Sequence, residues 1–227
     1  AIDSQVLESQ EIISEKLATE TPHTFVTELV KPALRNPSKW GAARCNDGSP
    51  FSFKVEKSEK RESNDWVIYL QGGGICEDNA FPCDKRQKRQ AHLISTQPGE
   101  DGEKSETIID TGIFNHDPSV NPEFFDANKV FAYYCSSDSW TGATDKARPI
   151  SSGEEWYFSG RINVEAMLQA LKDEYKLTDG GKTKILFGGS SAGCFGVNQN
   201  VDQLTSLFPK TANKGNIKLV SDACHIP

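Results

Sequence analysis

The stretch Ile185-Leu186-Phe187-Gly188-Gly189-Ser190-Ser191-Ala192-Gly193 decides the fold of this chain. Its apolar start is typical of a buried strand, and the segment after it has helical periodicity. Between them lies the G-x-S-x-G pattern of a nucleophile elbow, a sharp strand-to-helix turn in which glycine at 189 and 193 avoids clashes between Cβ atoms. Ser191 is therefore the predicted nucleophile, and the backbone N–H of Ala192, at the start of the helix, is a predicted oxyanion donor.

A second glycine motif lies earlier in the chain. Trp66-Val67-Ile68-Tyr69-Leu70 has the pattern of a buried parallel strand and runs into Gln71-Gly72-Gly73-Gly74. α/β-hydrolases take a second oxyanion donor from such a loop, so Gly73 and Gly74 are candidate donors. A triple glycine alone is commonly just a flexible loop, but an elbow follows about 115 residues later, in the order that this fold requires.

The rest of the chain alternates strands with helices. Strands are expected at 51–56, 66–70, 129–135, 183–188 and 216–221, and helices at 84–95, at 159–175 and directly after the elbow. This alternation predicts an α/β fold of the α/β-hydrolase type, with a mostly parallel sheet and helices on both faces. Residues 5–20 have the pattern of an isolated amphipathic helix, so residues 1–39 are expected to be a pro-region or linker and residues 40–227 the hydrolase domain.

Composition narrows the classes of function. The chain has 227 residues with 32 acidic and 25 basic side chains, a net charge of -7, which argues against nucleic-acid binding. The basic cluster Lys85-Arg86-Gln87-Lys88-Arg89 is expected to be a solvated helix face, with contact to an acidic polysaccharide as the alternative. No apolar run approaches the roughly 18 residues of a membrane span. The histidines are scattered and no Cys-x-x-Cys pair exists, so we expect no metal. The predicted serine chemistry implies no cofactor, and we expect a monomer.

Five segments together resemble landmarks of the pectin acetylesterase and Notum family, in order over roughly residues 40 to 224. They are Cys45-Asn46-Asp47-Gly48-Ser49-Pro50, Leu70-Gln71-Gly72-Gly73-Gly74-Ile75-Cys76, Tyr134-Cys135-Ser136-Ser137-Asp138-Ser139-Trp140-Thr141-Gly142, Gly188-Gly189-Ser190-Ser191-Ala192-Gly193 and Val220-Ser221-Asp222-Ala223. The resemblance implies a serine carboxylesterase that removes acetyl groups from a polysaccharide such as pectin. Three alternatives stay open: a Notum-like esterase acting on a palmitoleoylated protein, a non-catalytic secreted binding module on the same scaffold, and a thioesterase or peptidase that uses the same elbow.

Two positions depart from the family pattern: Gln71 stands where members usually carry Glu, and Cys194 where many have a second glycine. Asp138 and Trp140 follow the strand expected at 129–135, at the carboxyl end where open α/β sheets place their sites. They are candidate substrate-binding residues. For Trp140, simple packing in the core is an equal alternative.

The cysteines indicate an oxidised protein. Cys76 and Cys83 bracket a short loop directly after the glycine run, and we expect them to form a disulfide, which the resemblance supports. Cys45 and Cys135 each adjoin a family landmark and are the expected second pair. Disulfides imply a secreted protein, extracellular or in a cell wall. No partner is assigned to Cys194 or Cys224.

A serine nucleophile needs a base, and α/β-hydrolases order their triad as Ser, then Asp or Glu, then His. After Ser191 the chain contains Asp202, Asp222 and His225. Asp202 is expected to have a structural role on the elbow helix. In the family the acid and the histidine lie well beyond the Ser-Asp-Ala landmark, so the resemblance places both beyond residue 227 and implies that these residues alone are inactive. A triad that uses Asp222 and His225 is the alternative.

Overall fold

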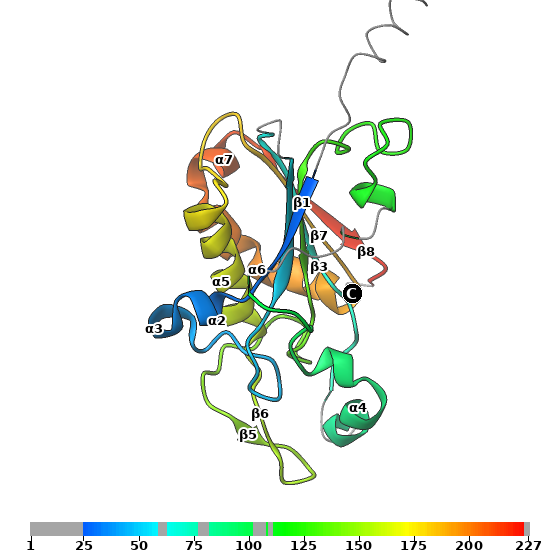
Figure 1. Cartoon of the computed structure of the whole chain (residues 1–227), viewed down its shortest axis with the longest axis vertical. Helices are drawn as coiled ribbons and strands as arrows, with labels where there is room; N and C mark the ends of the chain where they lie inside the picture. Colours follow the sequence, from blue (N-terminus) through cyan, green and yellow to red (C-terminus); the bar gives the residue numbers. More distant parts are fainter. Residues whose placement is uncertain (1–24, 59–62, 77–81, 102–107, 109–110, 225–227) are drawn as a thin grey trace, which may run out of the picture.

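A six-stranded sheet in the order β1-β2-β4-β3-β7-β8 forms the centre of the molecule (Figure 1). The computed structural model describes residues 25–58, 63–76, 82–101, 108 and 111–224. Strands β4, β3, β7 and β8 run parallel to one another, whereas β1 and β2 add antiparallel pairings at one edge. The strands are β1 (Phe25–Val30), β2 (Phe53–Ser58), β3 (Asp65–Leu70), β4 (Asn128–Ala132), β7 (Lys184–Ser190) and β8 (Ile217–Asp222). The predicted α/β class with a mostly parallel sheet is confirmed.

The long helices α5 (Gly160–Glu174) and α6 (Ala192–Leu207) pack together on one face of the sheet and bury the main core (Figure 1). The segment around the short helix η2 (Gly112–Phe114) covers part of the opposite face. The remaining elements are α2 (Pro32–Arg35), α3 (Pro37–Trp40), α4 (Cys83–Arg89), η1 (Ala91–Leu93), α7 (Pro209–Asn213) and the hairpin of β5 (Arg148–Pro149) and β6 (Glu155–Trp156). Within the described ranges, no helix is long and apolar enough to cross a membrane.

The first strand differs from the expectation that residues 1–39 are a pro-region or linker. β1 pairs along the whole of β2, from Phe25 opposite Ser58 to Val30 opposite Phe53. Leu29 is 3% exposed and Val30 is fully buried, so this strand completes the hydrophobic core. Residues 25–39 therefore belong to the domain, and the boundary at residue 40 was wrong. The helix expected over 5–20 lies outside the described residues.

The helix expected over 84–95 is shorter than its pattern suggested. α4 ends at Arg89, and Gln90 leads into the separate turn of η1. Of the four basic residues expected on a solvated face, Lys85, Lys88 and Arg89 are exposed but Arg86 is buried. The pattern of charges alone could not distinguish this one side chain from its neighbours.

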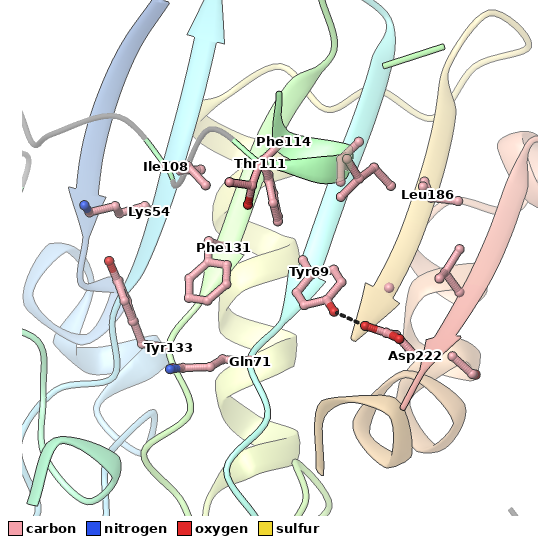
Figure 2. Close-up of a pocket in the computed structure, with 15 residues that line it drawn as sticks. Lys54, Tyr69, Gln71, Ile108, Thr111, Phe114, Phe131, Tyr133, Leu186 and Asp222 are labelled. Carbon is pink, nitrogen blue, oxygen red and sulfur yellow. Dashed lines mark hydrogen bonds between the residues drawn. The ribbon is translucent and has the colours of Figure 1, made fainter. Parts of the chain in front are cut away.

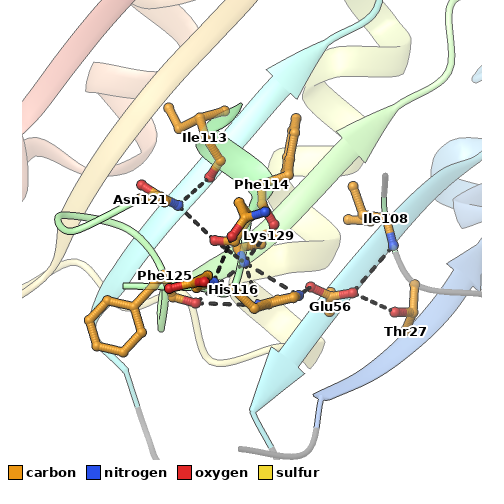
Figure 3. A network of polar contacts seen from close by, with 11 residues as sticks. Thr27, Glu56, Ile108, Ile113, Phe114, His116, Asn121, Phe125 and Lys129 are labelled. Carbon is orange, nitrogen blue, oxygen red and sulfur yellow. Dashed lines mark hydrogen bonds and ion pairs between the residues drawn. The ribbon is translucent and has the colours of Figure 1, made fainter. Parts of the chain in front are cut away.

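A buried ionic network joins three strands to the segment that covers the second face (Figure 3). Glu56 of β2 accepts from Nε2 of His116 at 2.9 Å and from the hydroxyl of Thr27 at 2.8 Å. Lys129 of β4, fully buried, donates to Nδ1 of His116 at 2.5 Å and to the carbonyl of Phe114 at 2.9 Å. His116 thus links the buried charges of Glu56 and Lys129, which have opposite signs. The network lies where β1, β2 and β4 meet residue 108 and residues 111–125.

Burial opposes the charged form of Glu56, but the hydrogen bonds from His116 and Thr27 outweigh it and hold the pKa of the Glu56 carboxyl below its usual 4.5. A carboxylate whose pKa is lower in the folded state stabilises the fold above the usual pKa and loses this effect as the pH falls through the lower value.

We expect Glu56→Gln to lower the free energy of unfolding by about 3 to 5 kcal/mol at pH 7, because it leaves the Lys129 charge without its counter-charge. The difference from wild type should shrink as the pH falls below the usual Glu pKa of 4.5 and through the lower pKa of Glu56 in the folded protein. Urea unfolding across pH 3 to 7 measures this. Glu165→Gln, at an exposed site on α5, is the matched control; an equal loss in both variants would contradict the prediction.

Candidate active site

Ser191 lies at the turn between β7 and α6 in the conformation expected of an elbow. Its φ is 52° and its ψ is -117°, an unfavourable combination for a residue with a side chain. Its N–H donates to the carbonyl of Asp222 at the end of β8, 3.0 Å away, and its own carbonyl accepts from Cys194 in the first turn of α6. These bonds on both sides hold the strained residue in place. Ser191 is exposed, so its hydroxyl is accessible to a ligand.

Close backbone contacts explain the glycines around Ser191. A Cβ at position 189 would lie 2.5 Å from the carbonyl oxygen of Gly193, and one at position 193 would overlap the carbonyl oxygen of Leu70 at the end of β3. The first turn of α6 therefore rests directly on the backbone of a neighbouring strand. Ala192, the first residue of this 16-residue helix, has a backbone N–H with no acceptor inside the helix, as an oxyanion donor requires.

The predicted oxyanion loop, Gly72 to Gly74, passes beside the elbow. A Cβ on Gly72 would lie 2.6 Å from the carbonyl oxygen of Ser190 and 3.1 Å from Cβ of Ser191. Gly73 and Gly74 have φ values of 153° and 70°, which L-residues rarely adopt. The structure thus brings two glycine motifs that are far apart in sequence into contact around one serine hydroxyl.

Gln71 links this loop to the next strand. Its side-chain oxygen accepts from the N–H of Tyr134 at 2.9 Å, and its carbonyl accepts from the indole N–H of Trp140 at 3.0 Å. Because the side chain acts only as an acceptor in this bond, a glutamine can replace the usual glutamate here without losing it.

Asp138 and Trp140 organise the loop after β4. The Asp138 carboxylate accepts from the hydroxyl of Ser136 and from three backbone N–H groups, those of Trp140, Gly142 and Gly160, at 2.6 to 3.1 Å. Burial raises the pKa of the Asp138 carboxyl, although these bonds favour its ionised form.

Trp140 is fully buried, and a Cβ on Gly196 of α6 would lie 2.7 Å from its side chain. A side chain with no exposed surface cannot line an open pocket, so the structure assigns Trp140 the packing role that was the alternative. Trp140 joins the oxyanion loop to the elbow helix, and its own backbone N–H donates to the Asp138 carboxylate.

Three disulfides surround the site, and all six cysteines are paired. The structure confirms the predicted pairs Cys76–Cys83, which closes the loop after the glycine run, and Cys45–Cys135. The third pair, Cys194–Cys224, joins the first turn of α6 to the residues after β8. At position 194, where many family members have a glycine, this chain thus has a cysteine that forms a disulfide.

The acid and base of a triad are not assembled in the described part of the chain. No hydrogen bond there joins the Ser191 hydroxyl to a histidine. Asp202, on α6, pairs with Arg161 at 3.1 Å and is exposed, in line with its expected structural role. Asp222 accepts from the hydroxyl of Tyr69 at 3.3 Å, and His225 lies outside the described residues.

A cavity of about 640 Å³ lies on the sheet face opposite α5 and α6, and sequence reasoning did not identify it (Figure 2). Tyr69 of β3, Phe131 of β4 and Tyr133 just after β4 point into it, and Asp222 and Gln71 mark its end near the elbow. The sequence predicts strands at 66–70 and 129–135, but only the folded sheet shows that the face beside them leaves room for a cavity. In the described ranges no group of three or more His, Cys, Asp or Glu side chains could hold a metal ion.

The fold and the elbow define a scaffold of the α/β-hydrolase class, with a serine presented at the carboxyl end of a parallel sheet. The family model for pectinacetylesterase matches residues 24–225. The chain belongs to the pectinacetylesterase family.

Relatives with assigned names support the same family. The chain is 36% identical to the palmitoleoyl-protein carboxylesterase NOTUM of Mus musculus over 164 residues, 72% of this chain and 30% of the relative, and 36% identical to the Homo sapiens protein over 166 residues, 73% and 30%. A crystal structure of the Wnt deacylase Notum from Drosophila matches with a TM-score of 0.65 at 27% identity, over 86% of this chain and 51% of that one. The chain spans about 30% of the length of these two named relatives.

Gly193→Ala tests the contact between α6 and β3. Alanine normally stabilises a helix relative to glycine. Here we expect a loss on the order of 1 to 3 kcal/mol, because the new methyl group overlaps the Leu70 carbonyl. Thermal unfolding measures it. Gly180→Ala, where an added Cβ meets nothing within 4 Å, is the control, and a stabilised Gly193→Ala variant would refute the contact.

Proposed function

We propose that the protein is a serine carboxylesterase with Ser191 as its nucleophile. One observation carries the proposal: an exposed serine in elbow geometry lies against a glycine loop that can supply further N–H donors. The serine alkoxide attacks the ester carbonyl, and the N–H groups of Gly73, Gly74 and Ala192 bind the oxyanion that forms. The alcohol leaves, and water then hydrolyses the acyl-enzyme in a second step.

The base in this proposal is a histidine outside the described residues. It takes the proton of Ser191 in the first step and returns it to the leaving alcohol. The disulfides favour an extracellular location, because such bonds persist in oxidising compartments. No cofactor takes part in this chemistry.

Two substrate classes compete. Removal of acetyl groups from a polysaccharide is supported by the description of the family. Removal of a long acyl group from a protein is supported by the names of the relatives and by the aromatic cavity that ends near the elbow. A non-catalytic binding module is the third possibility: an inactive palmitoleoyl-protein carboxylesterase of Danio rerio is 36% identical over 108 residues, 48% of this chain and 72% of the relative.

Ser191→Ala should lower kcat for p-nitrophenyl ester hydrolysis by about 10⁴-fold or more, because the covalent step is lost. The assay uses the protein that carries this chain, and Ser206→Ala, an exposed serine on α6, is the control. Unchanged activity of Ser191→Ala would rule out this nucleophile. No hydrolysis by the wild type would favour the binding module.

Acyl-chain length separates the two substrate classes. If the cavity receives a long acyl group, kcat/KM for p-nitrophenyl octanoate should exceed that for the acetate by about 10-fold or more, since each buried methylene contributes to transition-state binding. Both rates must depend on Ser191. A preference for the acetate would instead support the acetylated polysaccharide.

A further inference from the structure

Arg86 is the one basic side chain of α4 that points into the protein. It is 7% exposed, whereas Lys85, Lys88 and Arg89 on the same helix are exposed. Its Nη1 donates to the carbonyl oxygen of Gly73 at 2.7 Å, and its guanidinium lies 5.6 Å from the ring centre of the fully buried Tyr134. A cation from the basic cluster therefore reaches the predicted oxyanion loop.

Stability alone does not explain this arrangement. Burial lowers the pKa of the Arg86 guanidinium, which shows that the folded protein disfavours its charge. Its Nε and Nη2 are buried and have no hydrogen-bond partner among the described residues. Nη1 also donates to the side-chain oxygen of Gln90 at 3.3 Å. These two bonds and the aromatic contact still leave two donors of a buried charge unsatisfied, which costs free energy. The shorter of its two hydrogen bonds is the one to Gly73.

The bond to Gly73 fixes the direction of a peptide group. The Gly73–Gly74 peptide is trans, so its C=O and N–H point in opposite directions. With the carbonyl held on Arg86, the N–H of Gly74 points away from α4. Since Gly72 lies against Ser191, this loop runs beside the serine, where the N–H could bind the oxyanion that forms on the attacked ester carbonyl.

We propose that Arg86 is a positioning residue that holds the Gly73–Gly74 peptide in its oxyanion-binding orientation; this rests on the esterase function proposed above. Two successive glycines allow close approach to the substrate, but they also allow the peptide between them to turn over. The arginine prevents this from outside the loop. Its charge also polarises the peptide and strengthens the opposite N–H as a donor.

The covalent structure supports the same role. The Cys76–Cys83 disulfide ties the residues after the glycine loop to the first residue of α4, three residues before Arg86. The glycine loop and α4 are therefore joined by a covalent bond, Cys76–Cys83, and by the hydrogen bond from Arg86 to Gly73.

The test compares Arg86→Gln and Arg86→Lys with the matched control Arg89→Gln, which removes an exposed charge from the same helix. In Ser191-dependent ester hydrolysis by the protein that carries this chain, we expect Arg86→Gln to lower kcat about 10- to 100-fold with KM within about 3-fold, because the lost donor acts on the transition state. Arg86→Lys, which keeps the charge, should recover part of kcat. Arg89→Gln should behave as wild type.

A boronic acid that adds to Ser191 mimics the tetrahedral oxyanion and distinguishes positioning from a general loss of structure. Its affinity should fall with kcat in Arg86→Gln, while that of an unreactive ether analogue of the substrate stays the same. Wild-type kcat in Arg86→Gln, or equal losses of both affinities together with a fall in melting temperature in both Arg86 variants, would overturn the proposal. Absence of Ser191-dependent hydrolysis in the wild type would instead overturn the esterase function, and this role with it.

Discussion

The contact between the first turn of α6 and the end of β3 is the constraint on which the site depends. Backbone touches backbone there, and a side chain at 193 would fill space that the Leu70 carbonyl occupies. This close approach sets Ser191 beside the loop that continues from β3. Hydrogen bonds to Asp222 and Cys194 then hold the strained serine backbone from both sides. The reactive geometry therefore follows from packing of the scaffold and not from the serine itself.

A second layer of buried polar groups supports that contact. Gln71 and Trp140 connect the oxyanion loop to the segment after β4, and Asp138 holds that segment through four hydrogen bonds. Arg86 adds a charge directed at Gly73. Trp140 and Arg86 are buried and Gln71 and Asp138 are partly buried, and each of them fixes the direction of a backbone group near the elbow. Buried polar residues here determine geometry more than they add stability.

The predictions that held were those in which a local pattern has one structural solution. The elbow, the glycine loop and the Cys76–Cys83 pair are each encoded within about ten residues, because a tight turn permits few residue types. β1 lies within the residues expected to be a pro-region or linker, and only its pairing with β2 shows that it belongs to the domain. Trp140 follows the same logic. The sequence places it after the strand expected at 129–135, but its burial depends on contacts with Gly196 and Gln71.

The sequence by itself determined the strand-to-helix turn at Ser191, the positions of the four parallel strands along the chain and the family, because steric limits on short segments act locally. Tertiary structure alone decided which of four basic residues on α4 is buried, which cysteine pairs with Cys194, and which face of the sheet remains open as a cavity. The physical reason is that burial and pairing are set by neighbours distant in sequence. Arg86, unlike the exposed Arg89, lies against Gly73 and Tyr134, which the fold brings to it from distant parts of the sequence.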